Sequence, residues 1–366
     1  MILTPTTFLN SLRYAHSHSS HHGLEPYRTS CHCRRRRSIL PPPSPENLCT
    51  LTWTHLQATG NIGGYFARAL LQTGKHTVTA LTREGSKSTP PEGAKVVKVN
   101  YDDDDSLVSA LRGQQFLIIT LGVTAAPDLH ARIAAAAGKA GVQYVMPNAF
   151  GNPLNFDAAP QPGTFEHTVL TRRNDADNGV SSPVVLPCGF WYEWSLALGN
   201  EWFGFEIKDR KVTFFDDGRR VMTVSTWDQC GRAVAALLSL PEAGATPSLA
   251  DFKGGEARIY SFRVSQRDML DSLHRVLGTS DADWTISYES TAQRIADGVE
   301  GMKSGFAPWA FAKILYGRAF QASNKQADFA AGGDTANEAL GLPQESLDEA
   351  TARAVAMVES GWNPFA

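Results

Sequence analysis

Residues 57–64 are the stretch of this 366-residue sequence best suited to chemistry, and they read Gln57-Ala58-Thr59-Gly60-Asn61-Ile62-Gly63-Gly64. Glycines in a turn that opens a helix let backbone N–H groups approach a diphosphate, and the helix N-terminus adds about +0.5 elementary charge facing that anion. Gly60 would permit the close approach, and Gly63 would permit tight packing of helix against strand. The stretch therefore predicts a dinucleotide-binding turn, although glycine-rich turns also occur without a ligand.

A second candidate residue follows the next predicted strand, where the sequence reads Thr82-Arg83-Glu84. In dinucleotide-binding folds this position faces the adenosine ribose. An acidic residue there accepts from the 2′-hydroxyl of NAD, whereas an arginine pairs with the 2′-phosphate of NADP. Arg83, together with Lys87, therefore predicts NADP(H). The structural alternative is a solvated surface arginine, and the adjoining Glu84 acts against the preference.

The elements that must position these residues are predicted from alternating apolar runs and amphipathic stretches, which have the spacing of βαβ units. Predicted strands cover residues 76–82, 95–99, 116–121, 142–146 and 184–186, and predicted helices cover residues 62–73, 106–111, 129–140, 167–174, 226–239, 266–277 and 347–359. This alternation predicts an α/β fold with a doubly wound parallel sheet. We expect a dinucleotide-binding domain over residues 51–200 and a smaller C-terminal α+β substrate lobe over residues 201–366, partly interleaved with it.

Residues 1–50 differ from the rest of the chain in composition. They hold six Arg, no Lys and two Glu, a proline run and half of the ten His. Segments with so little buriable surface are typically disordered, so we expect a disordered leader, or non-native sequence joined just before Ala58. Alternatives are a mitochondrial transit peptide, a nuclear signal at residues 34–37, and a metal site at Cys31-His32-Cys33 that matches no zinc template. The default localisation is cytoplasmic, with mitochondrial as the alternative.

Composition argues against several function classes. The chain beyond residue 50 carries a net charge of −7, which does not favour binding to nucleic acid. No stretch approaches the roughly 20 apolar residues that a membrane span needs. Five Cys, three of them before residue 50, give no disulfide framework and fit a reducing compartment.

Together these residues resemble the NmrA-like and isoflavone-reductase-like family, the atypical short-chain dehydrogenases/reductases with a Rossmann-like NAD(P)-binding fold. The family's turn usually reads Gly-x-x-Gly-x-x-Gly, where this chain reads Gln57-x-x-Gly60-x-x-Gly63. Residues 139–151 match as well, and residues 189–195 and 362–365 are similar to the fungal branch. The resemblance covers about residues 57–366.

The resemblance implies site residues by position. The diphosphate would contact Gly60, Asn61 and Ile62, and Thr59 and Gly63 belong to the same cofactor-binding turn. Arg83 would bind the 2′-phosphate, and Asn100 would lie near the adenine. The nicotinamide side would be lined by Leu121, Gly122, Val123, Pro147 and Asn148. It further implies an NADP(H)-dependent reductase of a small, often aromatic or conjugated, substrate. The alternative is a non-catalytic NADP(H)-binding redox sensor that docks on a partner protein.

Three departures from the family weaken the enzyme interpretation. Gln57 replaces the first glycine, which costs about 1–2 kcal/mol if that position needs a positive φ. Residues 48–56 are poor in the apolar residues that a central parallel strand favours. No Tyr is followed by Lys four positions later, and the helix before the sixth strand, where isoflavone-reductase relatives carry a Lys, has none at residues 166–173.

The remaining candidates each have a structural alternative. His167 is a candidate for the missing acid, but a lone His is more often structural. Phe150, Trp191 and Tyr192, with their aromatic neighbours, are candidates for stacking on a flat substrate or for packing between the lobes. The acidic run at residues 102–105 could hold a metal, but more often such a run stabilises a helix N-terminus.

Overall fold

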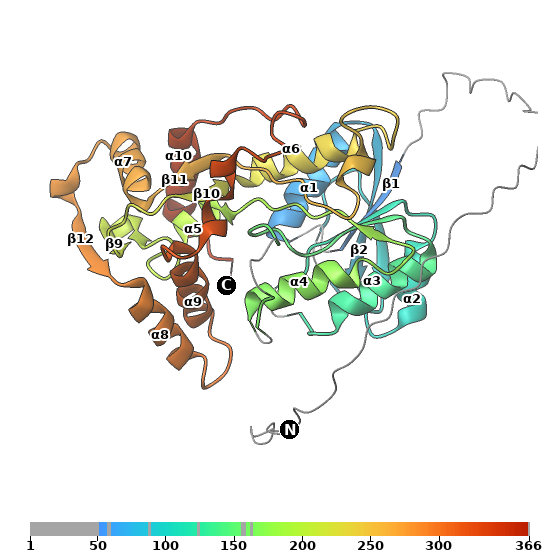
Figure 1. The fold of residues 1–366 in the computed structure, drawn as a ribbon, viewed down its shortest axis with the longest axis horizontal. Coiled ribbons are helices and arrows are strands. Elements are labelled where there is room, and N and C mark those ends of the chain that lie inside the picture. Colours follow the sequence, from blue (N-terminus) through green and yellow to red (C-terminus); the bar gives the residue numbers. More distant parts are fainter. Residues whose placement is uncertain are drawn as a thin grey trace, which may run out of the picture. The chain divides into compact units, whose positions relative to one another are not determined.

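Six parallel strands form the largest sheet in the part of the chain that the computed structural model describes, which is residues 51–56, 60–86, 89–122, 125–154, 159–161 and 164–364 (Figure 1). The strand order is β3-β2-β1-β4-β5-β6. The strands are β1 (Leu51–Leu56), β2 (His76–Arg83), β3 (Lys95–Val99), β4 (Phe116–Ile119), β5 (Tyr144–Met146) and β6 (Ser182–Pro183). This order confirms the predicted doubly wound α/β fold, in which the direction of winding reverses between β1 and β4. The predictions for the leader, Gln57, Thr59, Lys87 and Val123 lie outside the described residues.

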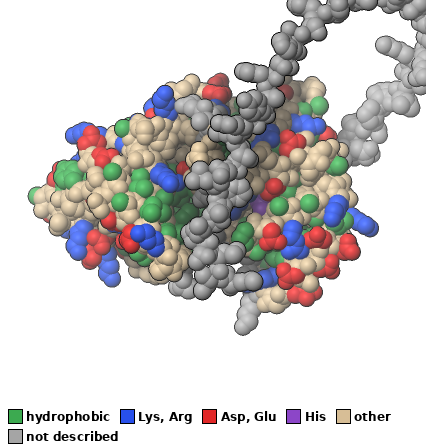
Figure 2. Space-filling model, turned by 60° about the horizontal axis from the view of Figure 1, so that its bottom comes forward, with side chains coloured by type: hydrophobic (Ala, Val, Ile, Leu, Met, Phe, Trp, Pro, Cys, Tyr) green, Lys and Arg blue, Asp and Glu red, His purple; other side chains and the backbone are tan. Residues whose placement is uncertain are grey.

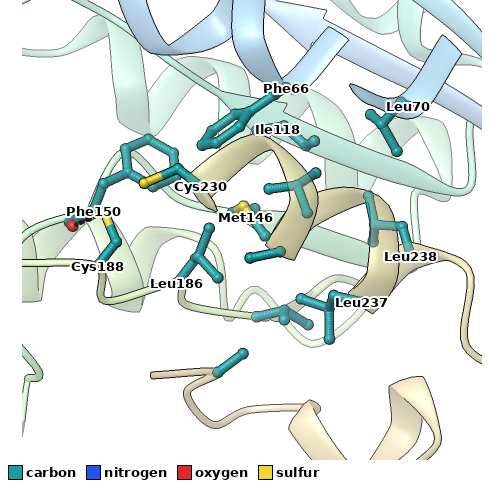
Figure 3. Close-up of a cluster of buried hydrophobic side chains, with 14 of the residues drawn as sticks. Phe66, Leu70, Ile118, Met146, Phe150, Leu186, Cys188, Cys230, Leu237 and Leu238 are labelled. Atoms are coloured by element: carbon teal, nitrogen blue, oxygen red, sulfur yellow. Dashed lines mark hydrogen bonds between the residues drawn. The ribbon is translucent and has the colours of Figure 1, made fainter. Parts of the chain in front are cut away.

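Helices cover both faces of this sheet, and its inner strands β4 and β5 are buried along their whole length. The helices are α1 (Asn61–Gln72), α2 (Asp104–Leu111), α3 (Leu129–Ala140), α4 (Phe165–Asp175) and α6 (Trp227–Leu238). Along β4, Phe116 and Ile118 pack in the cluster under α1 and α6, while Leu117 and Ile119 pack in the cluster under α2 and α3. Figure 3 shows part of the first cluster, where Phe66 and Ile118 lie over residues of α6. Continuous apolar runs of this kind are typical of parallel strands buried on both faces.

Two three-stranded sheets follow in the described part of the chain, with the orders β11-β10-β7 and β12-β9-β8. Their strands are β7 (Phe190–Trp191), β8 (Phe205–Glu206), β9 (Lys211–Phe215), β10 (Met222–Ser225), β11 (Phe262–Val264) and β12 (Thr285–Glu289), and the helices beside them are α5 (Tyr192–Ala197), α7 (Gln266–Leu277), α8 (Thr291–Gly301), α9 (Pro308–Phe320) and α10 (Leu347–Glu359). Short 3₁₀ helices cover Ile207–Asp209, Leu249–Phe252, Asp281–Asp283 and Lys325–Gly332. A separate aromatic-rich cluster fills this region. The domain boundary at residue 200 stays a prediction.

None of the helices in the described part of the chain combines the length and apolarity that crossing a membrane requires.

Some predicted boundaries were wrong for identifiable reasons. Helix α2 begins at Asp104 and not at Ser106, because the side chain of Asp103 accepts from the Asp105 N–H at 3.0 Å and caps it. The strand expected at residues 184–186 is instead Ser182–Pro183, and the chain continues through an isolated bridge between Val185 and Glu256. Despite its polar residues, Leu51–Leu56 forms the central strand β1, with β2 and β4 on either side.

Gly189 joins the large sheet to β7 at a point where only glycine fits. Its φ is +66°, and a Cβ there would lie 2.2 Å from the carbonyl oxygen of Thr223. Its N–H donates to the Gly151 carbonyl at 3.1 Å, and this hydrogen bond holds the segment that leads into β7 against the loop after β5. The close approach of these two backbone segments therefore fixes the path of the chain from the large sheet into β7 and α5.

We expect Gly189→Ala to lower the free energy of unfolding by about 3 kcal/mol, because a left-handed alanine costs about 1–2 kcal/mol and overpacking adds about 1–3 kcal/mol. Urea denaturation measures this loss. Gly179→Ala is the matched control, since Gly179 has φ +83° but no atom within 4 Å of a new Cβ. Equal losses in the two variants would contradict the proposed contact with Thr223.

Candidate functional site

The N-terminus of α1 lies at the carboxyl end of β1, beside the point where the winding reverses. Gly60 is its N-cap in an extended conformation (φ −71°, ψ 166°), and no side chain caps the helix. The first turn contains no acidic residue, and Ile62 and Gly63 are buried while Asn61 is exposed. The first amides of a helix have no partner within it, so this end can accept an anion.

A groove of about 420 Å³ begins at this helix end and runs along the exposed side of α1, lined by Gly60, Asn61, Gly64 and Arg68 of the helix and by Thr89 and Glu92 of the loop before β3. A larger cavity, about 570 Å³, lies between α4 and residues 254–258 and contains none of the predicted cofactor residues. Figure 2 shows acidic and basic side chains interspersed over one face of the molecule. Surface charge on that face therefore does not point to one kind of ligand.

Arg83 is the last residue of β2 and is exposed, at the same edge of the sheet as the N-terminus of α1. Tyr101 lies close to it: burial raises the pKa of this phenol to about 12, and the Arg83 guanidinium acts in the opposite direction. Asn100, at the end of β3, is exposed and accepts from the Asp102 N–H at 3.0 Å. The structure thus brings the predicted diphosphate, 2′-phosphate and adenine residues to one edge.

Asn148 joins the ends of β4 and β5, where the nicotinamide side was predicted. Its side-chain amide donates to the Leu121 carbonyl at 2.8 Å, and its backbone N–H donates to His130 Nε2 at 3.3 Å. Its own carbonyl accepts from Arg172 Nη1 of α4 at 3.0 Å. Asn148 is therefore fixed by three elements, and the buried Pro147 precedes it.

His130 is neutral in this arrangement. Burial, together with the smaller effect of the nearby Arg172 guanidinium, lowers the pKa of its imidazole to about 3. Because Nε2 accepts from the Asn148 N–H, the proton is on Nδ1, which lies 3.4 Å from a carboxylate oxygen of Asp175. His130, Arg172 and Asp175 were not predicted as site residues. Their contacts join residues up to 45 positions apart, and no local sequence signal marks them.

The predicted substrate residues have different surroundings. Phe150 is 7% exposed and packs edge-on against Phe66 of α1, with ring centroids 5.4 Å apart. Trp191 is half-buried. Tyr192 is fully buried, and its hydroxyl pairs with that of Thr351 at 2.7 Å. The packing of Tyr192 therefore favours a structural role, and we remove it from the substrate candidates.

His167 lies in the first turn of α4 and is half-buried. Its backbone N–H donates to the capping Thr164 hydroxyl at 3.2 Å, while its ring has no hydrogen bond within the described residues. This end of α4 packs on α9, where the rings of Phe165 and Phe311 lie 6.0 Å apart. A catalytic role for His167 stays a prediction.

The model of the NmrA-like family matches residues 53–166. The chain is 27% identical over 309 residues to an oxidoreductase (aprR) of Aspergillus flavus, covering 81% of this chain and 95% of that protein. It shares its fold with an isoflavone reductase at a TM-score of 0.62 and 20% identity, covering 82% of this chain and 98% of that one. A Vitis vinifera leucoanthocyanidin reductase, solved as a binary complex with NADPH, has a TM-score of 0.63 and 12% identity, covering 83% and 99%.

Protonation of His130 predicts one pH dependence of stability. Its pKa is about 3 in the folded chain against an ordinary 6.5, so between these values only the unfolded chain binds the proton. The group has no effect above pH 6.5, and below it stability falls by about 1.4 kcal/mol per pH unit. Between pH 6.5 and 4.5, His130→Gln should therefore lose about 2–3 kcal/mol less unfolding free energy than the wild type in urea denaturation.

The control is His76→Gln, which removes a different buried imidazole whose pKa burial lowers to about 4. The His76→Gln variant should still show the loss of unfolding free energy that protonation of His130 causes between pH 6.5 and 4.5. If wild type and His130→Gln lose stability equally over this range, the neutral His130 is contradicted.

Proposed function

We propose that this chain, in which residues 53–166 match the model of the NmrA-like family, is an NADP(H)-dependent reductase of a small conjugated or aromatic substrate. The observation that carries the proposal is that the uncapped N-terminus of α1 and the exposed Arg83 lie at one edge of the sheet. The names of its relatives support it, because they include an oxidoreductase and a reductase solved with NADPH.

The residues at this edge fit NADP(H). The amides of Asn61, Ile62 and Gly63 would hold the diphosphate, since no acidic residue of the first turn opposes an anion. Arg83 would pair with the 2′-phosphate, whose charge a guanidinium matches with two parallel hydrogen bonds. Asn100 would lie beside the adenine, and Thr59 and Val123 complete the proposed set. NAD would leave the Arg83 charge without a partner.

The chemistry proposed for the bound cofactor is transfer of a hydride to an electron-poor carbon of the substrate, and the reduction also consumes one proton. The chain's own part is to position the reacting groups. Asn148 fixes the ends of β4 and β5 to one another, so that Leu121, Gly122 and Pro147 present a rigid wall. Phe150 and Trp191 would contact the flat substrate beyond this wall. His167 is the candidate for delivering the proton.

A second candidate function is a non-catalytic NADP(H)-binding sensor that docks on a partner protein. The observation that favours it is the absence of the expected acids: helix α4 contains no Lys, and no Tyr of the sequence is followed by Lys four positions later. A sensor needs the cofactor edge but no proton donor. The two functions therefore share a binding site and differ in turnover.

Binding and turnover measured on the purified full chain separate the two functions. We expect NADPH to bind with micromolar affinity and its absorbance to fall when quinones, enones or aryl aldehydes are added. Micromolar NADPH binding without oxidation by any of these classes favours the sensor. Failure to bind NADPH at all would contradict both proposals.

Arg83→Ala tests how the nucleotide is selected. Loss of a charged hydrogen bond costs about 1.5–3 kcal/mol, so we expect NADPH affinity to fall about 10- to 100-fold while NADH affinity changes by less than about threefold. Fluorescence titration with each nucleotide measures both. Arg112→Ala, at the exposed end of α2, is the control and should leave both affinities unchanged. An equal loss for NADPH and NADH would show that Arg83 does not read the 2′-phosphate.

A further inference from the structure

The cavity of about 570 Å³ beside α4, here named the edge groove, is separate from the proposed nucleotide site, because none of the residues assigned to the cofactor lines it. One of its segments pairs with the chain that continues from β6, since the Ala257 N–H donates to the Val185 carbonyl at 2.8 Å. A second segment is fixed to the first, since the Ala336 N–H donates to the Arg258 carbonyl at 2.7 Å. The edge groove therefore lies beside α4 at the β6 edge of the large sheet.

The apolar side chains of the edge groove are mostly aliphatic. They come from α4, from the chain after β6, and from the loops on either side. A cavity of this volume is within the range that holds a small organic ligand. The apolar part of the lining favours an aliphatic body over a flat ring, because it consists of Leu154, Leu170, Val185, Phe252, Ala336 and Ala339.

The partly buried carboxylate of the edge groove, Glu256, already has a donor on each oxygen. Its Oε2 accepts from Arg258 Nε at 2.8 Å, and its Oε1 accepts from the Leu154 N–H at 2.6 Å. Its side chain is 15% exposed. Glu256 therefore does not need a cation from a ligand, and it holds the Arg258 guanidinium in place.

The two arginines that line the edge groove keep donors without an acceptor in the described part of the chain. Arg258 donates from Nε and Nη1 to Glu256 and Asp334, which leaves Nη2. Arg173 donates from Nη1 to Asp177 at 3.2 Å and from Nη2 to the Gly254 carbonyl at 3.0 Å, which leaves Nε. Guanidinium N–H groups pair best with carboxylate or phosphate oxygens. The remaining hydrogen-bonding capacity therefore favours an anion.

Asp334 shows that the Arg258 guanidinium accepts a carboxylate partner. Its Oδ2 lies 2.6 Å from Arg258 Nη1, yet its side chain is 84% exposed. An ion pair with so exposed a partner contributes only about 0–1 kcal/mol. A carboxylate inside the edge groove, with an apolar body to bury, can therefore take the place of Asp334 on Arg258.

We infer that the edge groove binds a small aliphatic carboxylate, whose carboxylate pairs with Arg258 and whose chain packs on Leu170 and Ala339. Arg173 adds a second positive charge to the lining. This inference goes beyond the proposed function, because the two sites share no residue. Helix α4 connects them: Arg173 lines the edge groove, and its neighbour Arg172 donates to the Asn148 carbonyl at 3.0 Å.

Isothermal titration of the purified full chain with three eight-carbon probes tests the inference: octanoate, the neutral octanamide and the cationic octylammonium. We expect octanoate to bind at least tenfold tighter than octanamide, a difference of about 1.4 kcal/mol. Octylammonium should bind no more tightly than the amide. Equal binding of octanoate and octanamide, a preference for octylammonium, or no binding of octanoate would overturn the inference.

Two variants locate the carboxylate within the edge groove. Asp334→Asn removes the competing carboxylate of the chain and keeps Arg258, so octanoate should bind at least threefold tighter. Arg258→Gln should abolish the preference for octanoate over octanamide. Because Arg258→Gln also leaves Glu256 without its partner and can unfold the chain, the rise in Asp334→Asn is the decisive result of the two.

A third variant blocks the edge groove by volume. Ala339 is exposed and lines the groove, so Ala339→Phe should fold normally and lower octanoate affinity at least tenfold. Ala331→Phe is the matched control, because Ala331 is exposed on the preceding segment but does not line the groove. It should leave octanoate affinity unchanged. An affinity that does not rise in Asp334→Asn, or does not fall in Ala339→Phe, would overturn the inference.

NADPH titration of the same proteins reports separately on the proposed function. Ala339→Phe should bind NADPH as the wild type does, because no proposed cofactor residue lines the edge groove. A wild-type chain that binds octanoate but not NADPH contradicts the proposed function alone. One that binds NADPH but not octanoate contradicts the edge-groove inference alone.

Discussion

All six strands of the large sheet run in the same direction, so their carboxyl ends meet at one edge. This single constraint brings together residues that are far apart in sequence: the N-terminus of α1 at Gly60, Arg83 at the end of β2, and Asn148 after β5. The reversal of winding between β1 and β4 leaves the space in which a ligand binds in such folds. The proposed nucleotide site follows from this arrangement, and the hydrogen bonds of Asn148 make one wall of it rigid.

Much of the fold could be predicted because its signals are local. The periodicity of residues 129–140, 266–277 and 347–359 predicted helices with the observed bounds, and residues 95–99 predicted β3. Errors arose where another part of the chain decides the structure. Strand β1 forms in spite of its polar residues, because β2 and β4 flank it, and the chain after β6 pairs with residues near Glu256, which no local pattern reveals.

The candidate site likewise contains residues that a local sequence signal predicts and residues that only the folded chain reveals. The glycine turn and Arg83 have recognisable sequence signatures, and the structure places Gly60 and Arg83 at a common edge. His130, Arg172 and Asp175 have none, because they act through Asn148 and through contacts made only in the folded chain. Tyr192 was predicted as a substrate residue because it lies among aromatic neighbours, but in the fold it is a core residue.

The central claim is that the amides opening α1 bind a diphosphate while the Arg83 guanidinium binds the 2′-phosphate. A crystal structure of the full chain with NADP⁺ tests it most directly. The account predicts diphosphate oxygens within hydrogen-bond distance of the backbone nitrogens at residues 61–63, and the guanidinium of Arg83 against the 2′-phosphate. A nucleotide bound elsewhere, or one whose 2′-phosphate lies away from Arg83, would contradict the account.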